Sequence, residues 1–495
     1  MYLPEINVCL SLCIIPRRPL AGCDVGEVIR IEVLPDEVLL AIFDFYVVPD
    51  LRSKPEIEKW ISLVHVCRRW RGLVFGSPRH LNLRLFCTPE TPSRDTLDVW
   101  PSLPLIIDGN ISSASSEENI IAALEHNDRI REIDLREVAS SQLERVLAAM
   151  QVPFPNATHL RLAASTDGQL LPAIPDSFLG PGGSAPCLRH FSLDGIPFLG
   201  LSNFLLSTTH LVDLHLYIPH WQSTYISPEA MVSCLSVLSN LENFTLRFQS
   251  LQSHPDMETQ HSPLATHSVL SVLTSLRFEG PSGYLEDLVA RIDAPRLYHF
   301  FITFYSQNNF CIPQLIRFIS RTPALKAPVE AHAVFERYVA RVKLISQTFG
   351  RGEFHVQIPC RRIALQLSSL VQVLASSSCP LFTVENLYIE DQGSTLRRTS
   401  RIDVTEWWEF LRPFVGVKNI YLFESIAFHI IYSFQARGAG RSIEMLPALQ
   451  KIFLAPTEVG PPGPDPSKLV QGPIGQFVAA RQLLGQSITI TVSGW

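Results

Sequence analysis

Two stretches in the middle of the chain decide the fold: Leu211–Leu216 reads LVDLHL, and Leu241–Leu246 reads LENFTL. Each stretch places apolar residues at its first, fourth and sixth positions. Apolar residues at the fourth and sixth positions alternate with a residue between them. A strand with one buried face gives this alternation, because successive side chains point to opposite sides of a sheet. The same template recurs at residues 130, 133 and 135; 157, 160 and 162; 188, 191 and 193; 273, 276 and 278; 297, 300 and 302; 384, 387 and 389; 417, 420 and 422; and 449, 452 and 454.

The spacing of the template indicates a repeat architecture. Neighbouring copies are separated by 23 to 33 residues, near the ~20–29 residues of a leucine-rich repeat. The one large gap, from Ile302 to Ile389, is 87 residues long and predicts two further copies, anchored at Val334 and Ile358. The segment Arg341–Ser346 (RVKLIS) also has the pattern of a strand, which could disturb the register in this gap.

Helical or irregular segments, such as residues 228–240 and 312–323, separate the templates. This alternation favours an α/β solenoid whose strands form one parallel sheet. The template residues would then point into the core, and the residue between the last two anchors would project from the concave face. An ordinary α/β domain with buried parallel strands also gives apolar runs and stays open as an alternative.

The composition is that of a folded chain. Of its 495 residues, 46% are hydrophobic and 18% are charged, with a net charge of −6. These values exclude a disordered chain and argue against a basic nucleic-acid-binding protein. The 37 prolines are consistent with many short elements joined by turns.

Motifs that carry chemistry are missing from the sequence. The ten cysteines form no C-x-x-C pair, and no P-loop, G-x-S-x-G, H-E-x-x-H or dinucleotide fingerprint is present. We therefore expect no enzymatic activity, no cofactor and no metal. An enzyme of an unrecognised α/β fold stays open, because catalytic triads are assembled from distant positions.

The sequence also gives no sign of export or membrane insertion. The apolar stretch near the N-terminus is preceded by Glu5 and followed by Arg17 and Arg18, which is the reverse of a secretory signal. No segment has the ~20 predominantly apolar residues of a spanning helix. We expect a cytoplasmic or nuclear protein without membrane contact.

The region before the repeats has a helical pattern. Residues 33–46 (VLPDEVLLAIFDFY) begin with Pro35 and two acidic residues, which favours a helix start. Apolar residues then recur every three or four positions. A second helical run, residues 60–78 (WISLVHVCRRWRGLVFGSP), ends at a glycine and a proline.

Both ends of this region resemble an F-box. The resemblance lies in Leu34-Pro35 with Glu37, and in the later run Val66–Arg71 (VCRRWR). The two ends are farther apart than the family usually shows, which predicts an inserted loop at Val47–Lys59. The chain is similar to F-box proteins that are numerous in mushroom-forming fungi, in which a variable repeat array follows. The motif covers about a tenth of the chain.

The resemblance implies a substrate-recognition subunit of an SCF-type E3 ubiquitin ligase that catalyses nothing itself. Its F-box would dock on the Skp adaptor, and through it on a cullin, while the repeats bind an unknown target protein. A protein-binding solenoid with a degenerate F-box, outside any ligase, stays open as the alternative. The residues expected at the adaptor are Leu34, Pro35, Asp36, Glu37, Leu39, Ile42, Phe43, Leu63, Val66, Cys67 and Trp70.

We therefore expect an α/β chain with a small N-terminal helical F-box and an irregular leucine-rich-repeat solenoid. Its parts would be a poorly ordered extension (1–30), the F-box (31–80), a connecting segment (81–111) and the solenoid (112–495).

The residues expected on the concave face change character along the array. The first six are small, polar or charged: Asp134, Arg161, Ser192, His215, Thr245 and Arg277. The last four are Phe301, Tyr388, Tyr421 and Phe453, which are candidate substrate-binding residues because large, rigid rings are frequent binding anchors. In the alternative, a C-terminal element such as residues 472–495 covers these rings.

Overall fold

A computed structural model of the chain divides into two compact units, Met1–Leu83 and Arg84–Trp495. The expected N-terminal extension, 1–30, and residues 48–58 of the expected inserted loop lie outside the described residues. The structure describes residues 31–47, 59–90, 94, 97, 100–111, 114–165, 171–180, 185–219, 225–249, 267–305, 310, 312–347, 351–360, 363–375, 381–392, 404–423, 426, 427, 429, 430, 445–455, 473–483 and 485–492.

The first unit is a group of short helices: η1 (Ile31–Val33), α1 (Asp36–Val47), α2 (Lys59–Val64) and α3 (Arg68–Gly76). Helix α1 begins directly after Pro35, and its first turn carries two acidic residues that favour the positive end of the helix dipole. The second expected helical run is two helices. Cys67 caps the later one, because its Sγ accepts a hydrogen bond from the backbone N–H of Trp70.

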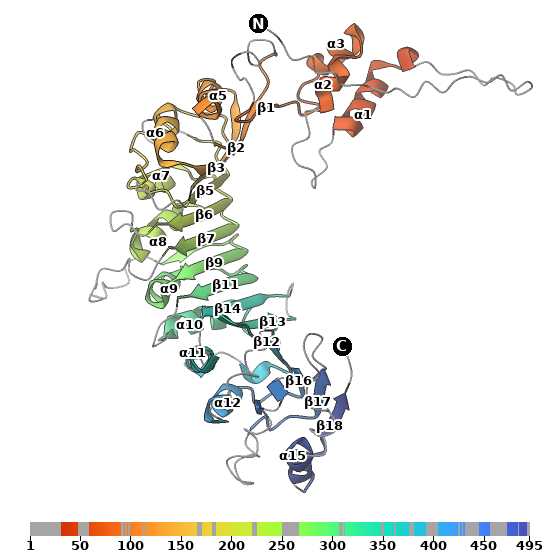
Figure 1. Cartoon of the computed structure of the whole chain (residues 1–495), viewed down its shortest axis with the longest axis vertical. Helices are drawn as coiled ribbons and strands as arrows, with labels where there is room; N and C mark the ends of the chain where they lie inside the picture. Colours follow the sequence, from red (N-terminus) through yellow and green to blue (C-terminus); the bar gives the residue numbers. More distant parts are fainter. Residues whose placement is uncertain are drawn as a thin grey trace, which may run out of the picture. The chain divides into compact units, whose positions relative to one another are not determined.

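The second unit is built on one long, mostly parallel sheet, which confirms the expected fold class. Among the residues that the structure describes, the sheet has 16 strands in the order β1-β2-β3-β4-β5-β6-β7-β9-β11-β14-β13-β12-β15-β16-β17-β18, and Figure 1 shows how they follow one another. Their bounds are β1 (Leu85–Cys87), β2 (Leu105–Asn110), β3 (Ile130–Val138), β4 (His159–Ala164), β5 (His190–Asp194), β6 (Asp213–Ile218), β7 (Asn243–Phe248), β9 (Ser275–Gly280), β11 (His299–Phe304), β12 (Pro328–Phe335), β13 (Val339–Ser346), β14 (Glu353–Pro359), β15 (Asn386–Asp391), β16 (Asn419–Phe423), β17 (Lys451–Ala455) and β18 (Thr489–Val492).

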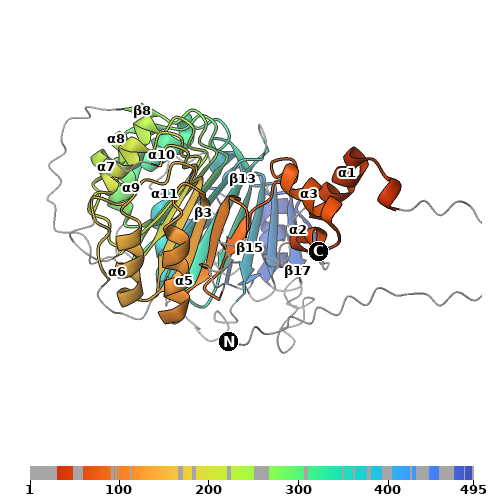
Figure 2. The same cartoon turned by 90° about the horizontal axis from the view of Figure 1, so that it is seen from above.

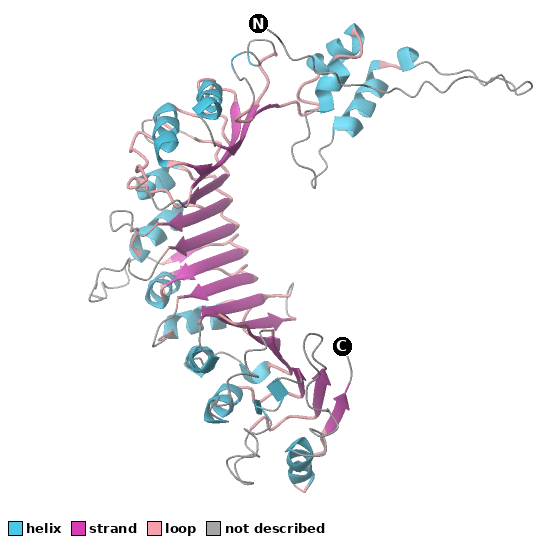
Figure 3. Ribbon diagram, in the orientation of Figure 1, coloured by secondary structure: helices cyan, strands magenta, loops and turns pink. Residues whose placement is uncertain are grey.

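Helical returns cover one face of this sheet and leave the other face open (Figures 2 and 3). The sheet curves so that the open face is the concave one (Figure 1). A two-stranded sheet, β8 (Ser268–Val269) with β10 (Ile292–Asp293), lies outside the long one. The returns include α5 (Ala114–Leu124), α6 (Ser140–Ala149), α7 (Leu201–Ser207), α8 (Pro228–Val237), α9 (Ser282–Val289), α10 (Pro313–Arg321), α11 (Ile363–Ala375), η4 (Leu381–Thr383), α12 (Val404–Leu411) and α15 (Pro473–Gln482).

The template residues form the core between the sheet and its helices. Leu214 and Leu216 on β6 are buried and pair in register with Phe244 and Leu246 on β7. The other templates are buried in the same way. Each strand therefore adds one layer of apolar side chains to a core that continues along the array, as expected for a solenoid.

The gap between Ile302 and Ile389 contains an antiparallel insertion in place of two further repeats. Strand β14 pairs in parallel with β11, and β12 pairs in parallel with β15. Strand β13 lies between β14 and β12 and is antiparallel to both. The three strands thus enter the sheet in the reverse of their sequence order, and the segment RVKLIS belongs to β13.

Both anchors predicted for this gap are wrong. Val356, rather than Ile358, lies opposite Ile302, and Ala333, rather than Val334, lies opposite Ile389. Ala333 is buried, whereas Val334 is half-buried on the concave side. Spacing misplaced both residues because a hairpin fills the same length of chain with a different register.

The sheet also begins and ends differently from expectation. Strands β1 and β2 lie within residues 81–111, the expected connecting segment; they pair with each other, and β2 also pairs with β3. At the other end, β18 pairs with β17. Within the described part of the C-terminal segment, β18 therefore extends the sheet, and α15 is one of the helical returns.

The turn before β16 depends on a glycine. A Cβ on Gly416 would overlap the carbonyl oxygen of Phe382, whereas a Cβ on Gly283 in α9 would meet no atom within 4 Å. We expect Gly416→Ala to lower the free energy of unfolding by about 1–3 kcal/mol. We expect Gly283→Ala to raise it by about 0.5 kcal/mol, because alanine loses less backbone entropy in a helix. Denaturant unfolding of the two variants checks this, and equal midpoints would contradict it.

Candidate functional site

The helices of the first unit share a small apolar core. Leu39 and Phe43 from α1 are both fully buried. The ring of Phe43 lies 4.7 Å from that of Trp70 on α3, measured between ring centroids. Trp60 and Leu63 on α2 are also buried. Residues from both ends of the motif therefore pack together, although residues 48–58 lie between them in the sequence.

An arginine ties the start of α1 to α3. The Arg69 guanidinium donates hydrogen bonds to the backbone carbonyl oxygen of Leu34, at 2.6 Å, and to Asp36 Oδ1, at 2.5 and 3.1 Å. Both side chains of this ion pair are exposed, so its contribution to stability is small. It nevertheless fixes the Leu-Pro end of the motif against its later arginine-rich run.

One face of α1 remains apolar and exposed. Val38, Ile42 and Phe45 recur at i, i+4 and i+7 and therefore lie along one side of the helix. Ile42 is 42% exposed and Phe45 is 86% exposed, with Tyr46 beside them. We call Val38, Ile42, Phe45 and Tyr46 the α1 surface. An exposed cluster of large apolar side chains is typical of a protein-binding site.

The structure divides the expected adaptor residues into three groups by their exposure. Leu39, Phe43 and Leu63 are buried inside the unit, so they hold the helices together rather than facing a partner, which corrects the expectation for them. Leu34 and Trp70 are half-buried. The exposed group contains Pro35, Asp36, Glu37, Ile42, Val66 and Cys67. Sequence reasoning missed Val38, Phe45 and Tyr46, although the spacing of 38, 42 and 45 marks a second apolar face.

In the second unit, one side chain per strand forms a row across the concave face. We call it the central row. Its members are opposite one another in the strand register, and the expected concave residues all belong to it. From β2 to β18 they are Asp108, Asp134, Arg161, Ser192, His215, Thr245, Arg277, Phe301, His355, Lys343, His332, Tyr388, Tyr421, Phe453 and Thr491.

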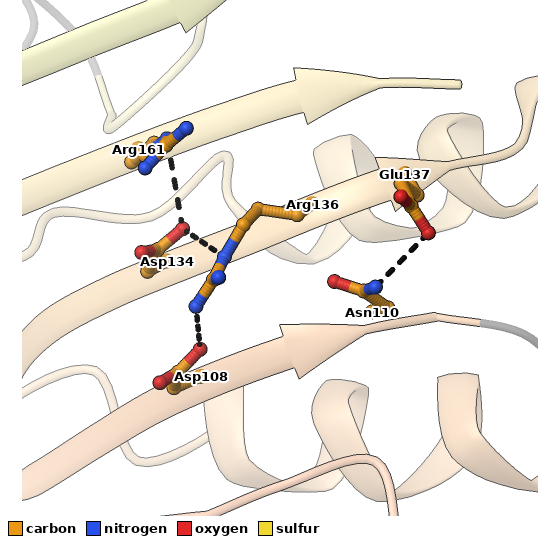
Figure 4. Close-up of polar contacts among 6 residues, drawn as sticks. All are labelled: Asp108, Asn110, Asp134, Arg136, Glu137 and Arg161. Atoms are coloured by element: carbon orange, nitrogen blue, oxygen red, sulfur yellow. Dashed lines mark hydrogen bonds and ion pairs between the residues drawn. The ribbon is translucent and has the colours of Figure 1, made fainter. Parts of the chain in front are cut away.

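The row begins with a network of opposite charges. Arg136 on β3 bonds Asp108 on β2 at 2.6 Å and Asp134 on its own strand at 3.1 Å (Figure 4). Arg161 on β4 lies 3.8 Å from the same Asp134 carboxylate. Burial raises the pKa of Asp134 even though two arginines oppose the shift. These charges are largely satisfied by one another, so this end of the face offers little unmatched charge.

Histidines lie on β4, β5 and β6. The rings of His159 and His190 stack at 3.9 Å, and His190 Nδ1 contacts a carboxylate oxygen of Asp213. Burial lowers the pKa of His159 and of His215. The described residues contain no cluster of three or more histidine, cysteine or acidic side chains arranged to hold a metal ion.

The middle of the row combines cations with an aromatic ring. The Arg277 guanidinium lies 4.6 Å from the centre of the Phe301 ring, which in turn lies 4.3 Å from the His355 ring. Lys343 Nζ bonds Glu353 at 2.9 Å. Burial, with Arg341 and Lys343 nearby, lowers the pKa of His355 to about 4.

Strands β12, β15, β16 and β17 add a stack of four rings to the row. His332 lies 4.3 Å from Tyr388, Tyr388 lies 4.2 Å from Tyr421, and Tyr421 lies 4.4 Å from Phe453, with the planes within 9° of parallel. We call these four residues the ring ladder. Burial and the neighbouring Tyr421 raise the pKa of Tyr388 to about 12, so its hydroxyl stays protonated at neutral pH.

The expected aromatic residues are therefore on the predicted face but do not form one group. Tyr388, Tyr421 and Phe453 are adjacent and half-buried. Phe301 is separated from them by the three inserted strands, and His332 takes its place in the ladder. Sequence reasoning missed His332 because the anchor predicted for its strand had the wrong register.

Comparisons with known proteins give one family match and one similar solved structure. A family model described as F-box-like matches residues 31–81. Among solved structures, the chain is similar to the leucine-rich repeat-containing protein LegL7 from Legionella pneumophila, at 15% identity and a TM-score of 0.27, over 82% of this chain and 99% of that chain. No curated protein matched the chain.

The chain thus combines an F-box-like domain with a sheet of leucine-rich-repeat type. Across the parts of the chain that the structure describes, no helix has both the length and the apolar character to cross a membrane.

Proposed function

We propose that the chain is the substrate-recognition subunit of an SCF-type ubiquitin ligase, acting in the cytoplasm or nucleus. The F-box-like domain would dock on the Skp adaptor, and through it on a cullin. The repeat sheet would hold a target protein. The chain would catalyse nothing itself and would act by proximity, because tethering raises the effective concentration of target lysines near the ubiquitin-loaded enzyme.

The observation that carries this proposal is the α1 surface within an F-box-like domain. Phe45 and Ile42 expose large apolar side chains although the unit buries other apolar residues of the same helix. Docking on an adaptor would remove these side chains from water, which is the main favourable term in protein association. The central row supports the second half of the proposal, since half-buried rings held in fixed positions are good protein-binding anchors.

Co-expression with the Skp adaptor tests the proposal. The wild-type chain should co-purify with the adaptor, whereas the double variant Ile42→Asp with Phe45→Asp should lose at least about tenfold in affinity, because two carboxylates would be placed in an apolar contact. Affinity is measured by titration of labelled adaptor.

The matched control is Leu483→Asp, which also changes a strongly exposed apolar side chain, 90% exposed, but lies in the second unit. It should bind the adaptor as the wild type does. If the wild-type chain does not bind the adaptor, the protein is instead a binding solenoid with a degenerate F-box.

A further inference from the structure

In the middle of the central row, Arg277 has no carboxylate partner among the residues that the structure describes. This arginine is exposed on β9. Nearby cations on this face are matched, because Arg247 on the adjacent strand β7 pairs with Glu279 at 2.8 Å and Lys343 on β13 pairs with Glu353 at 2.9 Å. The unmatched positive charge at this point is therefore carried by Arg277.

Phe301 holds the guanidinium of Arg277 in place. The cation lies over the ring at 4.6 Å, within the range of a cation–π contact. A guanidinium stacked on a ring keeps its N–H edge available, and that edge matches a carboxylate in geometry. The guanidinium of Arg277 is therefore positioned to bind an anionic side chain in the middle of the concave face.

Toward the other end of the row, the side chains are aromatic. The ring ladder presents Tyr388, Tyr421 and Phe453 in one line, and stacking on neighbouring rings restricts their side chains before any partner binds. Because these side chains are already restricted in the free protein, binding a partner costs less conformational entropy. Glu330 lies 3.8 Å from His332, the first ring of the ladder. The ladder therefore begins beside a negative charge, in contrast to the positive charge at Arg277.

Amide side chains run beside the ladder. Asn419 donates a hydrogen bond from Nδ2 to Asn386 Oδ1 at 2.8 Å, and both residues lie two positions before a tyrosine of the ladder. An asparagine amide has two donors and one acceptor, so the pair retains groups that can bond a peptide backbone.

We propose that the stripe from Arg277 to Phe453 binds one extended peptide segment of the target, with an acidic side chain at Arg277 and apolar side chains on the ring ladder. This inference rests on the proposed function and specifies the target's binding segment. Seven strand steps separate the two residues, and at about 4.8 Å per step they span about 34 Å. An extended chain covers this in about ten residues.

The same spacing fixes the pattern within the peptide. Tyr388 is five strand steps from Arg277, or about 24 Å, which corresponds to about seven residues of extended chain. The acidic residue should therefore lie about seven to ten residues from the apolar ones. A nucleic acid fits the stripe less well, because it would need many unmatched cations.

Selection from a displayed library of random 12-residue peptides tests the inference on the full chain. Enriched peptides should carry Asp or Glu at this separation from aromatic or aliphatic residues. Their affinity, measured by fluorescence anisotropy, should fall about tenfold or more with Arg277→Glu, because like charges would then face each other. Exchanging the peptide's acidic residue for lysine should restore binding to that variant.

Arg296→Glu is the matched control, since it makes the same charge change at an exposed arginine outside the central row. It should leave peptide affinity unchanged, and both variants should still bind the Skp adaptor. No enrichment, enrichment of basic peptides, tighter binding of a random single-stranded RNA, or equal affinity for the Arg277→Glu variant and the wild type would overturn the inference. Adaptor binding that persists in those cases leaves the proposed function standing.

Discussion

Replacing Phe43 by alanine is expected to lower the free energy of unfolding of the first unit by about 3–5 kcal/mol, the usual cost of removing a buried phenylalanine. Phe45→Ala, two positions later, should change it by no more than about 0.5 kcal/mol. The two side chains differ because Phe43 is fully buried against Trp70, whereas Phe45 is 86% exposed. Amide hydrogen exchange of α1–α3 in the full chain measures both effects.

Adaptor affinity separates the two roles further. Phe45→Ala should weaken adaptor binding while the helices keep their protection from exchange. Phe43→Ala should weaken both together, and Phe43→Leu should restore most of each because leucine refills part of the core. Unchanged protection in Phe43→Ala would show that Phe43 is not a core residue of the unit.

The sequence identified the core of α1 but assigned it the wrong role. Leu39 and Phe43 were expected at the adaptor because they are apolar and follow the Leu-Pro start. Helical periodicity shows which residues share a face, but it does not show which apolar face meets the rest of its own unit. Phe45 and Val38 lie on a second apolar face that the spacing also marks, but the packing of α2 and α3 decides that this face is the exposed one.

Prediction of the repeat sheet succeeded where each strand is followed by its own return. Templates such as 211–216 and 241–246 contain three anchors, and the polar or aromatic residue between the last two lies on the concave face as predicted. Prediction failed between Ile302 and Ile389 because strand pairing there is not sequential. No local pattern distinguishes β14 beside β11 from β12 beside β11, since both are alternating strands of similar length.

The inserted strands also make the stability of the second unit depend on pH. Burial, with Arg341 and Lys343 nearby, lowers the pKa of His355 to about 4, whereas an unfolded chain has a histidine pKa of about 6.5. Between these two values the unfolded chain binds more protons than the folded one. The free energy of unfolding should therefore fall as the pH is lowered from about 6.5 to about 4, and this histidine should cause no further loss below that range.

His355→Gln should remove this histidine's share of the loss, about 2 kcal/mol after allowance for its partial exposure. A smaller slope should remain, because burial also lowers the pKa of His159, His215 and His332 on the same face. Urea unfolding at about pH 7, about pH 5.5 and about pH 4.5 measures how the free energy of unfolding changes with pH. The control, His210→Gln, alters an exposed histidine outside the strands and should keep the wild-type slope. If His355→Gln also keeps it, burial and the nearby cations do not disfavour the protonated form of His355 in the folded chain.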